Sequence, residues 1–227
     1  GTDVAREASS VVLTDDNSSS IIQGVSTGRT IFDNIRKAMA YVLAVHVPIA
    51  GVALAPFVLG WPIVFSPVHI VFLELVIDPV CSIAFEAEPE EADIMRRPPR
   101  DSRISVFAGR DIFFSLAQGA FGLVAILGVY GYSLASGAAE TEARAIAFIA
   151  IVTVNLAMIL SSRSRYGSLL ESILRPNPVL WGIIAAAAAL LIFVIRNSYA
   201  AGLFGFSPPG ESLVLLALSP AFALLAV

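Results

Sequence analysis

The stretch from Ala38 to Leu73 reads AMAYVLAVHVPIAGVALAPFVLGWPIVFSPVHIVFL and contains no Asp, Glu, Lys or Arg over 36 residues. A membrane-spanning helix needs about 20 mostly apolar residues, so this stretch holds one complete span and the start of a second. Gly60-Trp61-Pro62 divides it, because glycine and proline interrupt helices and tryptophan prefers the membrane interface. The stretch therefore predicts a hairpin of two membrane helices.

The rest of the chain has the same apolar character. Hydrophobic residues make up 57% of the 227 residues and charged residues 14%, against about 25% charge in a typical soluble domain. This composition argues against a disordered chain, a collagen-like chain and a soluble globular enzyme. The net charge of −4 offers no basic surface, so we expect no nucleic-acid partner. Cys81 is the only cysteine, which excludes an intrachain disulfide and a cysteine-rich metal site.

Six apolar stretches are candidates for crossing a bilayer. They are long and continuous and lack the alternation of a membrane β-barrel, which favours helices over strands. We therefore expect an all-α membrane protein, a six-transmembrane-helix bundle of three hairpins. The expected spans are residues 38–60, 66–85, 112–135, 145–162, 178–195 and 212–227, of which the last is short.

The distribution of basic residues predicts how these spans are oriented. With the N-terminus inside, 12 of the 14 Lys and Arg residues fall on the cytoplasmic side, and only Arg144 and Arg196 fall outside. The positive-inside rule then places both termini in the cytoplasm. We expect a multi-pass protein of the cell membrane, with the lipid bilayer as its first partner.

Residues 1–29 are polar and differ from the stalk and membrane region, 30–227. The segment starts at Gly1 and is too short to bury a core, so we expect it to be the end of a larger cytoplasmic domain. A short helix is predicted over 3–9 and a strand over 10–14. The run Asp15-Asp16-Asn17 offers helix-capping chemistry before a helix that continues into the first span.

Two carboxylates, Glu74 and Asp78, lie inside the second expected span. Four residues apart, they share one helix face, and an ionised acid near the bilayer centre costs about 2.5–3.5 kcal/mol. Pro79 follows directly and should kink or unwind the helix, freeing the carbonyl of Leu75. Carboxylates beside free carbonyls suit a hard cation such as calcium. The alternatives are that Glu74 reaches an interface and that Pro79 is a simple kink.

Polar residues on other spans are further candidates. His46, in the first span, could bind a metal, carry a proton or pair with a carboxylate, or else form a hydrogen bond to a neighbouring helix. His69 is expected at the outer interface. For the single amides Asn155 and Gln118, helix-to-helix hydrogen bonding is the default. We expect no catalytic residue and no cofactor site, because the sequence contains no Walker-type loop and no nucleophile–base–acid set.

Several short segments of the first 100 residues form a recognisable set. They are GTDVAREAS (1–9), VVLTDD (11–16), Gly28-Arg29, NIRK (34–37), LELVID (73–78), Pro89, DIM (93–95) and RPPR (97–100). These segments closely resemble P-type cation-transporting ATPases: the N-terminal ones resemble the end of the α/β phosphorylation domain and the stalk of the fifth membrane helix, and the later ones resemble the sixth helix and following loop of the calcium-pump-like branch. The resemblance covers the whole chain and implies that the six spans are the fifth to tenth helices of a ten-helix pump.

The resemblance also implies what the complete protein does. It would be an ATP-driven ion translocase, with ATP and Mg bound only by the missing N-terminal part of the pump. The family motifs DKTGT, TGES and TGDGxND do not occur in this sequence, so we expect this chain alone to be inactive as an ATPase. A free-standing six-helix cation channel or carrier and a non-catalytic membrane subunit are the alternatives.

The resemblance assigns metal-site residues by position. Asp78 falls on an ion-binding Asp of calcium pumps, and Asn155 falls near a Glu of the eighth helix. Glu74 and His46 fall on Asn positions, whereas Ile49 replaces a Glu. The expected ligands of the transported cation are therefore Asp78, Glu74, His46 and Asn155, and calcium, another cation and protons all remain open.

Overall fold

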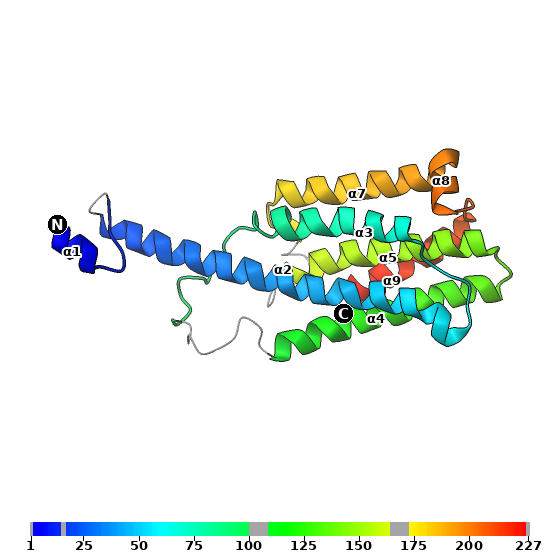
Figure 1. Cartoon of the computed structure of the whole chain (residues 1–227), viewed down its shortest axis with the longest axis horizontal. Coiled ribbons are helices and arrows are strands. Elements are labelled where there is room, and N and C mark those ends of the chain that lie inside the picture. Colours follow the sequence, from blue (N-terminus) through cyan, green and yellow to red (C-terminus); the bar gives the residue numbers. More distant parts are fainter. Residues whose placement is uncertain (1, 15–16, 100–108, 164–172, 226–227) are drawn as a thin grey trace.

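The protein is described by a computed structural model that covers residues 2–14, 17–99, 109–163 and 173–225. Within these ranges every regular element is a helix (Figure 1). The elements are α1 (Asp3–Ala8), α2 (Ser18–Leu59), α3 (Pro67–Pro79), the π-helix η1 (Val80–Ala84), α4 (Gly109–Ala135), α5 (Glu140–Ser162), α7 (Pro178–Arg196), α8 (Ser198–Phe204) and α9 (Glu211–Leu225). The side chains of Asp78, Cys81 and Ser82 lie outside the described part.

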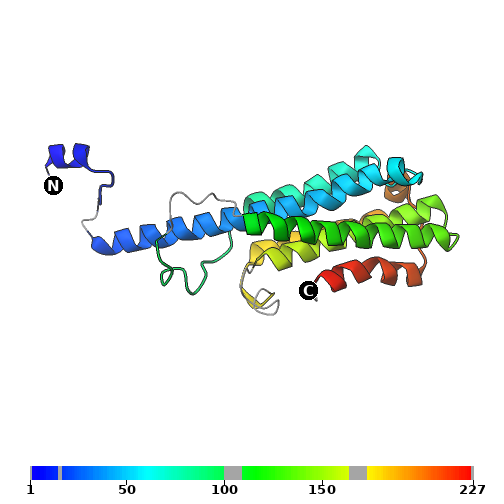
Figure 2. The same cartoon turned by 90° about the horizontal axis from the view of Figure 1, so that it is seen from below.

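Helix α2 has 42 residues and is therefore about 63 Å long, roughly twice the thickness of a bilayer core. Its N-terminal part extends far beyond the bundle formed by the later helices, and α1 lies past its end (Figures 1 and 2). Asn17 caps this end, since its Oδ1 accepts a hydrogen bond from the Ser19 amide at 3.0 Å. At the other end, Gly60 takes the left-handed conformation, with φ of 67°, that commonly closes a helix.

The strand expected over residues 10–14 is not formed. The backbone there is irregular, and Val11 is 75% exposed. A strand needs a neighbour for its amide and carbonyl groups, and no strand occurs in the part of the chain that the structure describes. The N-terminal segment therefore contributes one short helix, α1, without a core.

Four helices, α2, α4, α5 and α7, are long and apolar enough to cross a membrane. The apolar helices α3 and α9 are shorter, so helix length alone does not establish six spans, and that count stays a prediction. Helix α3 is short because of a local change in its helical geometry. The α-helix ends at Pro79, and the chain continues as η1, in which the Phe85 amide donates to the Val80 carbonyl at 3.2 Å.

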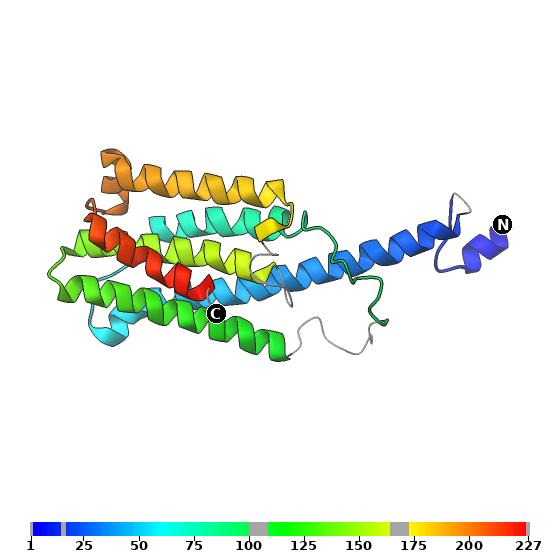
Figure 3. The ribbon, with the colours of Figure 1, turned by 180° about the vertical axis from the view of Figure 1, so that it is seen from behind.

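The helices α3, α4, α5, α7 and α9 run alongside the C-terminal half of α2 (Figures 1 and 3). Helix α5 is the centre of this bundle: it is buried on nearly all sides and contacts α2, α4, α7 and α9. A helix that is apolar all round is typical of such a central position. Helix α9 runs back toward the side of the bundle from which α2 extends, and α8 lies at the opposite end (Figures 2 and 3).

Close packing of α2 against α4 depends on a glycine. A Cβ atom added at Gly119 would lie 2.5 Å from the Ala44 carbonyl oxygen and 2.7 Å from the Cβ of Val47. Ala44 is also the residue whose carbonyl Pro48 deprives of its usual helical donor. Small residues let membrane helices approach in this way, so Gly119 fixes the separation of the two helices.

Candidate cation site

The four expected ligands lie on three helices: His46 on α2, Glu74 and Asp78 on α3, and Asn155 on α5. Among the side chains that the structure describes, no three His, Cys, Asp or Glu residues come together as a metal site. The Asp78 side chain is outside the described part. A shared Glu74–Asp78 site therefore stays a prediction, and the other residues are considered one by one.

Asn155 is 1% exposed, about two turns before the end of α5. Neither its Oδ1 nor its Nδ2 has a hydrogen-bond partner among the described residues. The default helix-to-helix bond is thus absent here, although Gln118 does make one, donating to the Ser161 hydroxyl at 2.8 Å. An unsatisfied buried amide costs about 1–3 kcal/mol, so Asn155 carries a cost that the described fold does not offset.

Glu74 is half-buried, one turn before Pro79. Its carboxylate makes no hydrogen bond or ion pair with any described residue. The expected disturbance at Pro79 is found as the change from α-helix to the π-helix η1. Short π-helical segments occur frequently at functional sites, and an intramembrane acid marks one by default.

His46 is exposed on α2, and its ring bonds within its own helix. Nδ1 lies 2.8 Å from the Val42 carbonyl oxygen. Because a carbonyl only accepts, Nδ1 must donate, which leaves Nε2 of the neutral ring with a free lone pair. Metal-binding histidines are commonly oriented by such a bond through the other ring nitrogen.

His69 differs from the interfacial position expected for it. It is fully buried at the start of α3, surrounded by the rings of Phe65, Phe148, Phe204 and Phe206 at centroid distances of 5.1–5.5 Å. Its Nδ1 accepts from the Ser66 amide at 3.0 Å. The aromatic packing between α3, α5 and α8 explains this burial, and His69 is a structural residue of the end of the bundle where α8 lies.

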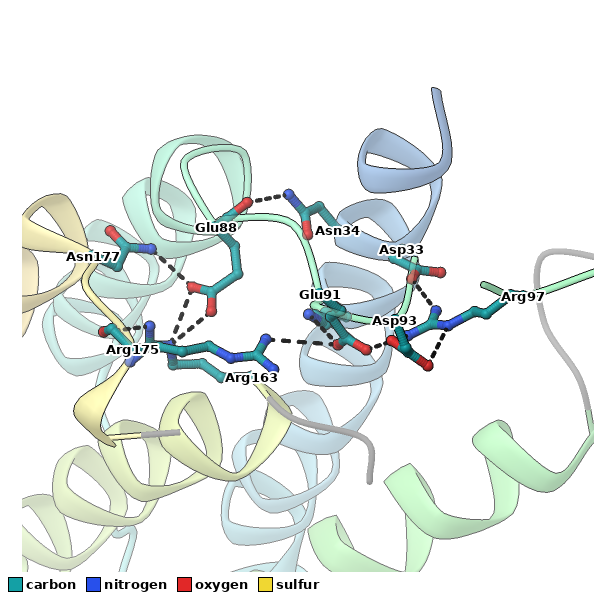
Figure 4. Close-up of polar contacts among 10 residues, drawn as sticks. Asp33, Asn34, Glu88, Glu91, Asp93, Arg97, Arg163, Arg175 and Asn177 are labelled. Carbon is teal, nitrogen blue, oxygen red and sulfur yellow. Dashed lines mark hydrogen bonds and ion pairs between the residues drawn. The ribbon is translucent and has the colours of Figure 1, made fainter. Parts of the chain in front are cut away.

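A buried polar cluster that the sequence analysis missed lies directly beyond η1 (Figure 4). The carboxylate of Glu88 accepts from Arg163 Nε at 3.1 Å and from Asn177 Nδ2 at 2.9 Å. Its backbone carbonyl accepts from Asn34 Nδ2 at 2.8 Å. Asn177 also donates to the carbonyl of Ala84, the last residue of η1, at 3.0 Å. The π-helix is thus tied to α2, α5 and α7 at one point.

A second set of charges joins the loop after η1 to α2 (Figure 4). Arg97 pairs with Asp33 at 2.5 Å, with Asp93 at 2.7 Å and also with Glu91. Glu91 in turn pairs with the buried Nζ of Lys37 at 2.8 Å. Burial raises the pKa of Glu91, but Lys37 and Arg97 outweigh it and hold that pKa below its usual range. The hydrogen bond from Arg97 likewise lowers the pKa of Asp93.

Comparison with known proteins identifies the family. Residues 62–227 match the family model described as the C-terminus of cation transporting ATPases. The chain is 33% identical over 201 residues to a calcium-transporting ATPase of Bacillus subtilis, covering 86% of this chain and 22% of that protein. It is 38% identical over 131 residues to a calcium-transporting ATPase of Listeria monocytogenes, covering 57% of this chain and 15% of that protein.

A further relative is the sodium/potassium-transporting ATPase subunit alpha-2 of Homo sapiens, with 36% identity over 128 residues, 56% of this chain and 12% of that protein. The chain thus spans about a fifth or less of the length of these relatives. The helical fold, the apolar composition and the match over residues 62–227 all indicate the same membrane domain. The chain belongs to the cation-transporting ATPase family, and it is a multi-pass membrane protein corresponding to the C-terminal membrane domain of a P-type cation ATPase.

Proposed function

We propose that this chain supplies half of the transport path of an ATP-driven cation pump, and that Asp78, Glu74, His46 and Asn155 bind the transported ion. The observation that carries the proposal is the amide of Asn155, which is buried in α5 without a partner among the described residues. An apolar side chain there would avoid the desolvation cost of the amide. A ligand that binds during transport gives a reason for the polar residue.

The chemistry of the four side chains favours a small cation. Carboxylate and amide oxygens from Asp78, Glu74 and Asn155 suit a hard cation such as calcium. The free Nε2 of His46 suits a proton or a softer metal ion. The bacterial relatives are named calcium-transporting, so calcium is the first ion to test, followed by other cations and protons.

The proposal assigns ATP and Mg binding to the missing N-terminal part of the pump. The chain alone should therefore release no phosphate from ATP above background when purified in detergent, with or without added cations. Cation-stimulated release that persists after removal of contaminating pumps would contradict this assignment and would favour a complete enzyme.

The proposed path requires that both termini face the cytoplasm, with three hairpins crossing the membrane. Reporter fusions after Ser136 and after Phe206 should report the outer side, and a fusion near Arg97 the inner side. The loop containing Arg97 is tied to the cytoplasmic extension of α2 through Asp33. An outer-side signal at Arg97 would overturn this topology.

The decisive experiment is cation-dependent phosphoenzyme formation by the complete protein in membranes. Asp78→Asn should abolish the cation dependence, Glu74→Gln should weaken it or shift its pH profile, and His46→Ala should have the smallest effect. The matched control is Ser133→Ala, because Ser133 is fully buried on α4 and its hydroxyl is satisfied by the Val129 carbonyl at 2.8 Å. Normal cation dependence in both acid variants would place the site on other helices.

A further inference from the structure

A cavity of about 560 Å³ lies at the cytoplasmic end of the bundle, between α2, α4, the end of α5 and the end of α9. Its polar end is lined by Arg36 and Lys37 of α2 and by Arg110 and Asp111 of α4. Lys37 and Asp111 are the last charges before the uncharged stretches 38–73 and 112–139. The charged end of the cavity therefore lies where the hydrocarbon region of the membrane should begin.

The guanidinium groups of Arg36 and Arg110 each have N–H donors without an acceptor among the described residues. Arg36 pairs with Asp111 through Nη2, but its buried Nε has no partner in the described part of the chain. Arg110 is exposed and lies over the Phe114 ring, 5.5 Å from its centroid, without an ion pair to any described residue. Lys37 is neutralised by Glu91 at 2.8 Å. Asp111 offsets only one of the two positive charges of Arg36 and Arg110. The remaining positive charge favours binding of an anion in the cavity.

The remaining walls of the cavity are apolar or carry neutral donors. Phe114 and Phe121 line it, and they are 58% and 43% exposed, so the apolar wall continues onto the outer surface of α4. Ser162 adds a hydroxyl group to the lining of the cavity. A soluble anion gains nothing from the aromatic wall, whereas a lipid places its phosphate at the arginines and an acyl chain along the rings.

We infer that this cavity binds the phosphate headgroup of an anionic phospholipid from the cytoplasmic leaflet. Basic pockets between membrane helices on this side attract such headgroups, and each Lys or Arg near the surface contributes about a fivefold preference. The inference is independent of the proposed ion site, because none of the cavity residues belongs to it. Lipid binding and cation binding can therefore fail separately.

The test uses the complete protein in phosphatidylcholine vesicles that contain a phosphatidylglycerol with a photoreactive acyl chain. Cross-linking should label the α4 segment that carries Phe114 and Phe121. Unlabelled phosphatidylglycerol should compete, whereas phosphatidylcholine and inorganic phosphate should not. Equal labelling by a photoreactive phosphatidylcholine, or competition by inorganic phosphate, would overturn the inference of an anionic-lipid site.

Variants of Arg110 separate headgroup recognition from general contact with lipid. Arg110→Gln should lower the preference for phosphatidylglycerol over phosphatidylcholine about fivefold, and Arg110→Lys should largely retain it. The matched control is Arg96→Gln, because Arg96 is an exposed cytoplasmic arginine outside the cavity. Size-exclusion chromatography checks the folding of each variant, because a folded variant should elute without aggregates. An unchanged preference in Arg110→Gln would contradict the site.

Discussion

Directly beyond η1, the buried carboxylate of Glu88 accepts hydrogen bonds from Arg163 and Asn177. Deeper in α5, the equally buried amide of Asn155 has no partner among the described residues. Burying a polar group is costly in both places, but only the first cost is offset within the fold. The comparison separates a polar cluster that holds helices together from a buried amide whose cost the described fold leaves uncompensated, and this is the contrast on which the proposed ion site depends.

The largest effect is expected at Arg163, which is fully buried. Arg163→Met would leave the carboxylate of Glu88 buried without its cation, and breaking a buried pair costs about 3–5 kcal/mol. The thermal unfolding midpoint of the complete protein should fall strongly.

The control for this prediction is the double variant Arg163→Met with Glu88→Leu, which removes both charges. It should recover most of the lost stability, because replacing a whole buried pair is often neutral. If the single variant were as stable as the unaltered protein, the polar cluster around Glu88 would not hold the helices together.

A smaller loss is expected where α2 meets α4. Gly119→Val places carbon atoms against the Ala44 carbonyl and Val47, and overpacking of this kind costs about 1–3 kcal/mol. The midpoint should fall less than for Arg163→Met. Gly128→Val is the matched control on the same helix, since a Cβ there would meet nothing within 4 Å. Equal losses in both variants would indicate an effect of helix propensity alone.

The smallest effect concerns pH at the loop after η1. The pKa of Glu91 is held below its usual range, so its ion pairs stabilise the fold above that range and are lost as pH falls through the lowered pKa. Hydrogen exchange of the loop amides should therefore increase, relative to the intrinsic rate, on acidification from pH 7 to about pH 3, which lies below the ordinary pKa of a glutamate carboxyl.

Glu91→Gln should give faster exchange already at pH 7, with less further change on acidification. Glu90→Gln is the control, because Glu90 is exposed and, within the described ranges, accepts a hydrogen bond only from the Ser26 hydroxyl. A loop that exchanges equally at both pH values in the unaltered protein would show that the ion pairs do not hold it.

Much of the helical architecture follows from the sequence by local reasoning. The uncharged run 38–73 predicts a helix, a turn at Gly60 and a second helix, and the structure has them. The capping chemistry predicted at Asn17 and the disturbance predicted at Pro79 are also confirmed. These features depend on residues that are close together in the chain, and for that reason the sequence predicts them.

The features that the sequence does not reveal depend on distant partners. Glu88 and Arg163 are 75 residues apart, so nothing in the sequence near either residue indicates that they pair. The strand over 10–14 was wrong because pairing needs a neighbour that the described chain does not provide. Polarity within apolar spans singles out Glu74, His46 and Asn155, but hydropathy does not show how each helix is rotated and therefore whether the three side chains meet.

The most direct test of the contrast between paired and unpaired groups is cation-dependent thermal stability of Asn155→Leu in the complete protein. Removing an unsatisfied amide should raise the unfolding midpoint without cation, by the equivalent of about 1–3 kcal/mol if Leu fits the same space. Binding to the folded state raises the midpoint of the unaltered protein when calcium is added, and this increment should disappear in the variant. A lower midpoint together with a full calcium increment would contradict the account, because Asn155 would then be a structural residue.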